Sequence, residues 1–222
     1  MAQEDSQPRP HLSKRRILEA AVKVMDEDGL EAVTMRRLGR ELGVEAMSLY
    51  NHVEDKQAIL EGVCEVVMGE YEFPRRAGDW TQEVRAGGRA WRKLLKAHPN
   101  AIPLFSERRK PMTSVEALKP MESALDMLRR AGLSEEDTVQ AFRAFGSYIF
   151  GFVLMEVGNM YAGTGSGTAE VPDPSEMARL LPADQLPRFV ELLPQLTMCD
   201  AEADFEFGMD LLIAGLHARL SN

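Results

Sequence analysis

The segment at 34–53, TMRRLGRELGVEAMSLYNHV, constrains the fold more than any other part of the chain. Its apolar residues recur at four-residue spacing in two short stretches, which predicts two short helices at about 35–42 and 46–52. Thr34 is a suitable N-cap for the first helix, and Gly43 predicts a turn between the two. Helices of this length are not stable alone, so longer helices must cover them. The residues of the apolar face are Leu38, Leu42, Leu49 and Val53.

Two longer helices are predicted on either side of this pair. The first should begin after Ser13, whose hydroxyl can cap it, and end at Gly29, a residue type common just after a helix. The other should begin after Asp55 and end near Phe73 and Pro74. Each carries one apolar stripe with helical spacing. The stripe residues are Ile17, Leu18, Ala21, Val24 and Met25 in the first helix and Ile59, Leu60, Val63 and Val67 in the other.

The rest of the chain shows helical patterns, and strand-like alternation of apolar and polar residues is absent. The stretch at 161–187 is rich in glycine and proline, which predicts a flexible loop. Residues 1–12 contain little apolar surface and predict a mobile arm. The predicted fold class is therefore all-α. The further helices are expected at about 80–97, after Pro99, at about 112–131 with a kink at Pro120, at about 134–160 and at about 202–220.

The charge of the chain is distributed unevenly. The formal net charge is −9, but the basic and acidic residues between positions 9 and 56 cancel. Such a chain has no general basic coat for nucleic acid or anionic lipid, so any such contact must be local. The two cysteines and four scattered histidines give neither a disulfide framework nor a zinc site, and no metal or cofactor is expected. Without a membrane-length apolar run, the protein is expected to be soluble and cytoplasmic.

A helix, a glycine turn and a second short helix form the arrangement that presents a helix to the major groove of DNA. The outer face of the first short helix carries Arg36, Arg37 and Arg40, and Arg36 is placed to reach a guanine edge. The alternative interpretation of these arginines is a solvated helix face. The candidate base readers are Ala46, Met47, Ser48, Asn51 and His52, and the candidate phosphate contacts are Thr34, Tyr50 and Lys56.

Some of these candidates also have a simpler structural interpretation. Tyr50 is compatible with a core position, and His52 is compatible with packing beneath the helix that follows Asp55. Ala46 and Met47 are small or apolar, which favours contact with thymine methyl groups over hydrogen-bonded readout. The sequence therefore does not specify the operator.

The segment from Ser13 to about Met68 resembles the DNA-binding head of the TetR family of repressors. The resemblance is carried by the run LEAAVKVMDEDGLEAVTMRRLGRELGVEAMSLYNHVEDKQAIL. It implies a helix-turn-helix head at 13–56, joined by a fourth helix to a larger effector-binding and dimerisation domain at 57–222. It also implies a homodimer whose two heads grip a palindromic operator in double-stranded DNA, while a ligand in the larger domain sets the distance between them.

The later part of the chain resembles the effector domain of tetracycline repressors, through WRKLLKAHPNAIPLF, AFRAFGSYIFGFVLMEVG and DFEFGMDLLIAGLHARL. In those repressors the bound drug carries a magnesium ion, and His98 stands about where one metal-binding histidine would be. Residues 68–71 offer no histidine pair, which departs from the pattern for magnesium-tetracycline. An apolar or aromatic effector is expected instead. Its candidate contacts are His98, Met112, Met121, Phe145, Tyr148, Phe152, Met155 and Glu156.

The helix expected at 134–160 has an apolar arc of about 200°, which is wider than the stripe of about 100° typical of a surface helix. It is therefore expected to be covered on two sides. Gly208 and Gly215 in the last helix allow close approach, so these two helices predict a four-helix dimer interface. Glu156 falls within the arc and needs a partner, either a basic residue or a ligand or cation. His98 is interpreted either as a helix C-cap or as a ligand contact.

Three functions are consistent with these patterns. The leading hypothesis is a ligand-responsive repressor that an effector releases from DNA. A constitutive DNA-binding or scaffolding dimer without an effector is the second. The third is a small helical-bundle enzyme that uses His98 and Glu156 as an acid–base pair. No nucleophile elbow, phosphate loop or metal motif accompanies these two residues, so the sequence favours a protein that is not an enzyme.

Overall fold

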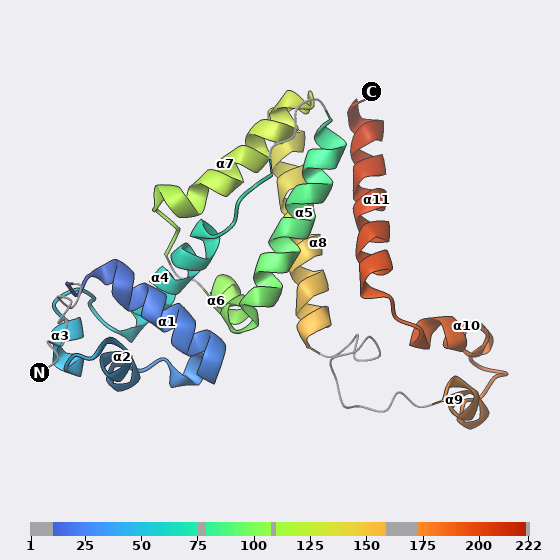
Figure 1. The fold of residues 1–222 in the computed structure, drawn as a ribbon. Coiled ribbons are helices and arrows are strands. Elements are labelled where there is room, and N and C mark those ends of the chain that lie inside the picture. Colours follow the sequence, from blue (N-terminus) through green and yellow to red (C-terminus); the bar gives the residue numbers. More distant parts are fainter. Residues whose placement is uncertain (1–10, 75–78, 108–109, 159–172, 221–222) are drawn as a thin grey trace, which may run out of the picture. The chain divides into compact units, whose positions relative to one another are not determined.

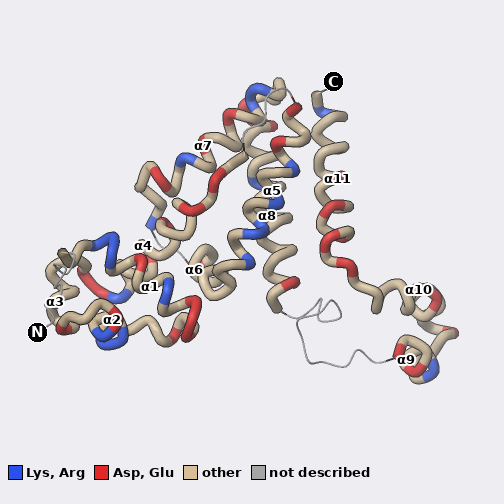
Figure 2. Tube along the Cα trace, viewed as in Figure 1, with Lys and Arg blue, Asp and Glu red and all other residues tan. Residues whose placement is uncertain are grey.

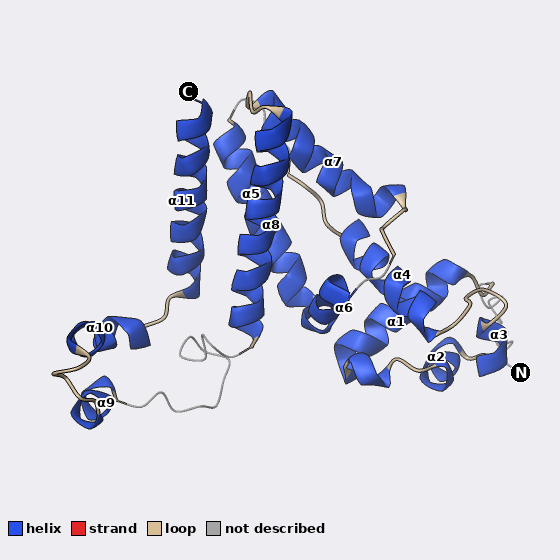
Figure 3. Cartoon of the chain, turned by 180° about the vertical axis from the view of Figure 1, so that it is seen from behind, coloured by secondary structure: helices blue, strands red, loops and turns tan. Residues whose placement is uncertain are grey.

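The structure is a computed structural model of the chain, and it describes residues 11–74, 79–107, 110–158 and 173–220. Within these ranges the ordered elements are all helices joined by loops, and none is a strand (Figure 1, Figure 3). The predicted all-α fold is confirmed.

The chain divides into two compact units, each with its own core. The first unit contains residues 1–72 and 98–121, and the second contains residues 73–97 and 122–222. The predicted helix-turn-helix head lies wholly within the first unit. The division of the chain into a head and an effector domain at residue 56 stays a prediction.

The amino-terminal helices of the first unit begin at the predicted caps. The side chains of Ser13, Thr34 and Asp55 each accept a backbone hydrogen bond at the start of a helix. Gly29 and Gly43 follow two of these helices with φ angles of +88° and +67°, which favour glycine. The helices are α1 (Lys14–Asp28), η1 (Leu30–Ala32), α2 (Met35–Leu42), α3 (Ala46–Leu49) and α4 (Lys56–Gly69).

Two of these helices end earlier than predicted. α3 ends at Leu49, because the chain then forms a turn in which the N–H of His52 bonds to the Leu49 carbonyl at 2.9 Å, only three residues back. α4 ends at Gly69 and not near residues 73–74. The N–H of Glu70 likewise bonds three residues back, to the carbonyl of Val67 at 3.1 Å.

The short helices are covered as their length requires. α1 packs against both α2 and α4. Ile17 and Met25 of α1, Leu38 of α2, Leu49 of α3 and Ile59 of α4 are fully buried. Each such side chain contributes about 1.5–3 kcal/mol relative to an exposed one, so this core holds α2 and α3 in place.

The stretch after residue 97 returns to the first unit. Asn100 lies against α1, where its side-chain amide donates to the Met25 carbonyl at 2.9 Å. Ala101 and Ile102 are buried beside it. The elements here are η2 (Pro99–Ala101) and α6 (Ile102–Glu107), followed by α7 (Val115–Arg130), which belongs to the first unit up to residue 121.

Three long helices pack together in the second unit, namely α5 (Trp80–Ala97), α8 (Glu135–Val157) and α11 (Ala201–Leu220). Ser134 caps α8, since its hydroxyl accepts a hydrogen bond from the N–H of Asp137 at 3.0 Å. Val153, Phe205 and Met209 are completely buried in this unit. α7 runs through Pro120 as one continuous helix.

The prediction of a loop at 161–187 is wrong for residues 174–180, which form a helix, and a second helix begins at Pro187. Residues 159–172 lie outside the described part of the chain. Pro174 and Pro187 each occupy the first turn of a helix, where the missing N–H has no intrahelical partner, so they begin helices instead of breaking them. The two helices are α9 (Pro174–Leu180) and α10 (Pro187–Thr197).

Among the described helices, α8 is the one that is long and apolar enough to match a membrane span by length and composition. It packs against α5 and α11, and Phe145, Ile149 and Val153 are buried there. About a third of its apolar window, 33%, is buried in these contacts.

Candidate nucleic-acid interface and effector domain

α2 and α3 approach each other closely at Gly39. A Cβ at this position would lie 2.9 Å from the Val44 carbonyl oxygen and 3.2 Å from the Ala46 nitrogen. Both atoms belong to the backbone and cannot rotate away as a flexible side chain would. Glycine at this position therefore allows the first residue of α3 to rest on α2.

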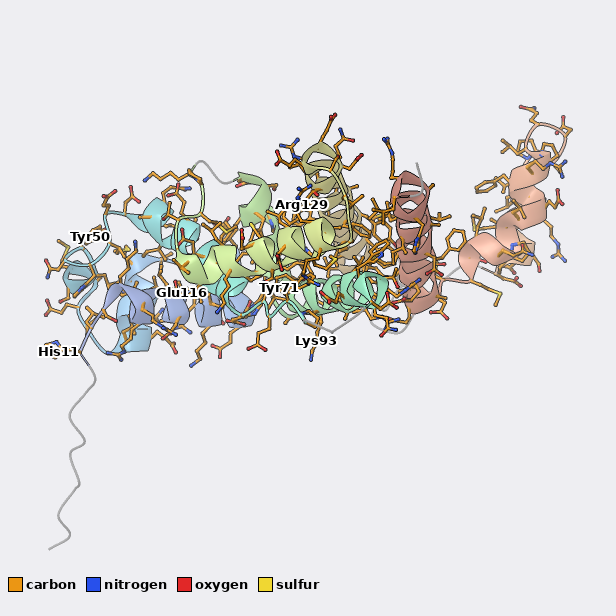
Figure 4. The ribbon with its side chains drawn as sticks, turned by 90° about the horizontal axis from the view of Figure 1, so that it is seen from above. His11, Tyr50, Tyr71, Lys93, Glu116 and Arg129 are labelled. Carbon is orange, nitrogen blue, oxygen red and sulfur yellow. The ribbon has the colours of Figure 1, made fainter. Side chains whose placement is uncertain are left out.

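The outer face of α3 and the turn after it is exposed. Met47 is 71% exposed and Tyr50 is 47% exposed, while Leu49 between them is fully buried. Asn51 and His52 are also exposed, so His52 does not pack beneath α4. Figure 4 labels Tyr50 in this region. Ala46 and Ser48 are half-buried. DNA contact by the six candidates in this segment, which exclude the buried Leu49, stays a prediction.

The predicted phosphate contacts flank this face. Thr34 is exposed, and its hydroxyl oxygen already accepts a hydrogen bond from the Arg37 N–H at 3.2 Å. Lys56 is half-buried in the first turn of α4. Arg36 and Arg40 are exposed, and no described acidic side chain forms an ion pair with either. Both guanidinium groups are therefore available to a negatively charged ligand.

Arg37 differs from the two neighbouring arginines. Its guanidinium donates to Glu41 at 2.6 Å and to Asp28 at 3.1 Å. Lys23 of α1 donates to the other carboxylate oxygen of Glu41 at 2.7 Å. Hydrogen bonds from Lys23 and Arg37 lower the pKa of Glu41 from its usual 4.5 to about 2. The sequence predicted Arg37 on a DNA-facing surface, whereas its side chain forms ion pairs with Asp28 and Glu41 in the structure.

The second unit contains a buried ion pair that involves Glu156. Arg92 of α5 binds both carboxylate oxygens of Glu156, at 3.0 Å and 2.9 Å, and Lys96 bonds to the same carboxylate. The side chains of Arg92 and Glu156 are each only 9% exposed. Burial alone would raise the pKa of Glu156, but the hydrogen bonds from Arg92 and Lys96 hold it below its usual value. Of the partners considered from the sequence for Glu156, the structure therefore shows basic residues, Arg92 and Lys96.

Aromatic residues of α8 and α11 surround the same arginine. The Arg92 guanidinium lies 4.7 Å from the ring centre of Phe205 and 5.5 Å from that of Phe152. The hydroxyl of Tyr148 donates to the Phe205 carbonyl at 2.9 Å, and its ring covers Gly208 so closely that a Cβ there would overlap it. Gly208 thus allows close approach within the chain, through Tyr148.

The predicted effector contacts are divided between the two units. Those on α8 lie in the second unit, where Phe145 and Phe152 are buried and Met155 is 39% exposed. His98, Met112 and Met121 lie in the first unit. Their contact with an effector stays a prediction.

His98 has two acidic partners. Its Nδ1 lies 2.8 Å from Asp26 Oδ2 and its Nε2 lies 3.1 Å from Glu70 Oε2. It directly follows Ala97, the last residue of α5, and it precedes η2 as the N-cap residue. Its interpretation as a helix C-cap stays a prediction. Glu156, the other half of the acid–base pair considered from the sequence, is bound to Arg92 in the second unit. Among the described residues, no group of three or more metal-ligating side chains is present.

An ion-pair ladder between α5 and α11 was not anticipated from the sequence. Basic residues recur on α5 at spacings of three and four, and acidic residues recur on α11 at a spacing of four, as each would on one helix face. Figure 2 shows these basic residues on α5 and the acidic residues on α11. This spacing was the signal available in the sequence. The pairs are Arg85 with Glu206 and Asp210, Arg89 with Glu206 at 2.6 Å, and Arg92 with Glu202 at 2.5 Å.

The helix-turn-helix geometry and the helical second unit agree with comparisons to known proteins. A family model of bacterial regulatory proteins of the TetR family matches residues 17–63. A second model, of the tetracycline repressor-like C-terminal domain, matches residues 73–220. The chain belongs to the TetR family. It is a ligand-responsive transcriptional regulator of this family.

Individual relatives cover nearly the whole chain. An HTH-type transcriptional regulator of Saccharopolyspora erythraea is 31% identical over 97% of this chain and 89% of its own length. The class A tetracycline repressor of Escherichia coli is 28% identical over 94% of this chain and 92% of its own. The structure of the TetR family protein ActR of Streptomyces coelicolor in complex with actinorhodin superposes with a TM-score of 0.80 at 27% identity, covering 96% of this chain and all of that one.

Proposed function

We propose that this TetR-family regulator is a repressor that binds a palindromic operator as a homodimer and is released by a small apolar or aromatic effector. The observation that carries the DNA-binding part is the exposed face of α3. Met47 of α3 and Tyr50, Asn51 and His52 of the turn after it are exposed, while Leu49 is buried and Gly39 lets α3 lie close to α2. A rigid, exposed helix face after a tight turn is the geometry that enters a major groove.

DNA binding is tested with a duplex that the wild-type protein selects from random-sequence DNA. We expect binding that weakens steeply as salt rises, because phosphate contacts release counterions. Arg36→Gln should weaken binding by about 10-fold or more, since a bidentate base contact contributes roughly 1–3 kcal/mol. Arg188→Gln removes the same charge from α10, where the side chain is 85% exposed, and serves as the matched control. Equal loss in both variants would exclude the α2–α3 face.

The dimer is supported by apolar side chains that one chain leaves exposed on α8 and α11. α11 is apolar on two sides: Phe205 and Met209 are buried, whereas Phe207 and Leu211 are 65% and 60% exposed. On α8, Leu154 is 51% exposed. A second copy of the chain would bury these faces, as expected for a four-helix interface.

Sedimentation equilibrium checks this interface. Phe207→Glu with Leu211→Glu should give a monomer and abolish cooperative operator binding, because a twofold site needs two linked heads. Val115→Glu introduces a charge at a 73% exposed residue of α7 and should leave the assembly unchanged. A wild-type chain that sediments as a monomer at micromolar concentration would refute the dimer.

The effector part is supported by the resemblance to regulators solved with small molecules, such as ActR with actinorhodin and with (S)-DNPA. A library of apolar and aromatic compounds should contain at least one that stabilises the protein against heat and releases it from the selected duplex. A ligand at 100 times its dissociation constant adds about 2.7 kcal/mol to stability. If every compound that stabilises the chain leaves DNA binding unchanged, release by an apolar or aromatic effector is refuted. Such a regulator acts where the DNA is, in the bacterial cytoplasm.

A further inference from the structure

We infer that Arg37 is a positioning residue of the DNA-reading head, which acts by bridging α1 to α2 and not by touching DNA. The inference rests on the proposed DNA binding through α2 and α3. The sequence places Arg36, Arg37 and Arg40 on one short helix without indicating that their roles differ. Arg36 and Arg40 present their charge to solvent, while the Arg37 side chain is only 22% exposed.

The contacts of Arg37 engage all three nitrogens of its guanidinium group. Nη1 donates to Glu41 Oε2 at 2.6 Å within α2, and both Nε and Nη2 lie 3.1 Å from Oδ2 of Asp28, the last residue of α1. Lys23 of α1 binds the second oxygen of Glu41 at 2.7 Å and lies 4.0 Å from Glu27. The cluster joins two basic groups to three acidic ones, so it offers no net positive charge to a phosphate.

The ion-pair cluster between α1 and α2 affects the position of α3 through the backbone of α2. Arg37 and Glu41 belong to α2, and their partners Lys23 and Asp28 belong to α1, so the cluster fixes the longitudinal position of α2 on α1. α3 in turn lies close to α2 at Gly39, where a Cβ would be only 3.2 Å from the Ala46 nitrogen and where the Val44 N–H donates to the Gly39 carbonyl at 2.9 Å. A shift of α2 along α1 therefore moves the exposed face of α3 by a similar distance.

The experiment measures the affinity for the selected duplex between about 50 and 200 mM salt, the range in which phosphate contacts dominate the salt dependence. Arg37→Gln should weaken binding by about threefold to tenfold at every salt concentration and leave the slope of log K against log salt unchanged. Lys56→Gln, at a predicted phosphate contact, should instead make the slope shallower by about 0.9 for each protomer.

Arg37→Lys is the decisive second variant, because lysine keeps the charge but cannot bridge two carboxylates with a planar fork. We expect it to bind DNA as weakly as Arg37→Gln. In a double-mutant cycle, Asp28→Asn should add little to Arg37→Gln, since both remove the same bridge.

The outcomes separate this inference from the function on which it rests. A shallower slope for Arg37→Gln, or wild-type affinity for Arg37→Lys, would show that the charge itself contacts DNA and would overturn the positioning role alone. A wild-type protein that selects and retains no duplex would overturn the proposed DNA binding and the inference with it.

Discussion

The two units of the chain are stabilised in different ways. In the first unit, the helices of the head begin at caps that lie next to them in the sequence, such as Ser13, Thr34 and Asp55. In the second unit, three long helices are joined by ion pairs between residues 60 to 125 positions apart, as in the contacts of Lys96 with Glu156 and of Arg85 with Asp210. The difference shows that the positions where the head helices begin follow from local signals, whereas the ion pairs of the second unit form between side chains that meet only after folding.

The largest effect is expected from breaking the buried ion pair of the second unit. Arg92→Ala leaves the buried Glu156 without its bidentate partner, so the free energy of unfolding should fall by about 3–5 kcal/mol. Urea denaturation measures this change. Arg188→Ala breaks an exposed pair with Glu191 and should change stability by less than about 1 kcal/mol. Similar losses in both variants would mean that the buried network does not hold this unit together.

A smaller effect is expected where α2 meets α3. Gly39→Ala places a methyl group 2.9 Å from a backbone oxygen, so we expect a loss of about 1–3 kcal/mol in unfolding free energy together with weaker DNA binding. Gly69→Ala is the matched control, because its Cβ would meet a neighbouring atom at an ordinary 3.7 Å. Thermal unfolding and duplex binding should both distinguish the two variants. Unchanged DNA affinity in Gly39→Ala would contradict the rigid link between α2 and α3.

The local caps should contribute less than either packed contact. Asp55 accepts a hydrogen bond from the Ala58 N–H at 2.8 Å, and Asp55→Ala should cost about 1 kcal/mol of stability. Asp55→Asn keeps a side-chain acceptor and should remain close to the wild type. Chemical denaturation of the three proteins tests this order, and equal stability of all three would show that the cap is not needed.

The smallest effect is a pH dependence within the head. Folding lowers the pKa of Glu41 from 4.5 to about 2, so its ionised carboxylate stabilises the folded chain. This contribution is complete above about pH 4.5 and is lost as the pH falls toward 2. The stability difference between the wild type and Glu41→Gln, measured by urea denaturation, should therefore be constant near neutral pH and shrink in acid. If the stability difference between the two proteins grew in acid, the pKa of Glu41 would be raised by folding and not lowered.

Much of the candidate DNA interface could be predicted from the sequence. Thr34 and Gly43 mark the ends of α2, and the apolar spacing that buries Leu49 leaves Met47 and Tyr50 exposed. These features follow from residues within a few positions of one another. The resemblance to TetR-family heads rests on the same short run, which is why it agreed with the family comparison.

Other features could not be predicted in this way. Glu41 lies on the same helix as Arg37, but Asp28 does not, and the partners of Arg92 and His98 are also distant in the sequence. Helical periodicity predicts the face on which a residue lies, but not which side chain of another helix lies opposite it.

The prediction of a loop in the glycine- and proline-rich stretch at 161–187 was wrong because the effect of a proline depends on its position in a helix. Proline disfavours a helix interior but is favoured in the first turn, where Pro174 and Pro187 lie. Asp173 caps the helix that begins at Pro174, whereas Leu186 before Pro187 makes no side-chain cap hydrogen bond.

The sequence by itself determined that the chain is helical, where the first helices begin, and which face of the third helix is exposed, because caps and apolar spacing act within one or two helical turns. The tertiary structure decided which charged groups are free and which are engaged. Arg36 and Arg37 are adjacent and chemically identical, yet only Arg37 meets the carboxylates of Asp28 and Glu41. The physical reason is that an ion pair depends on the distance between side chains in the folded chain, which adjacency in the sequence does not fix.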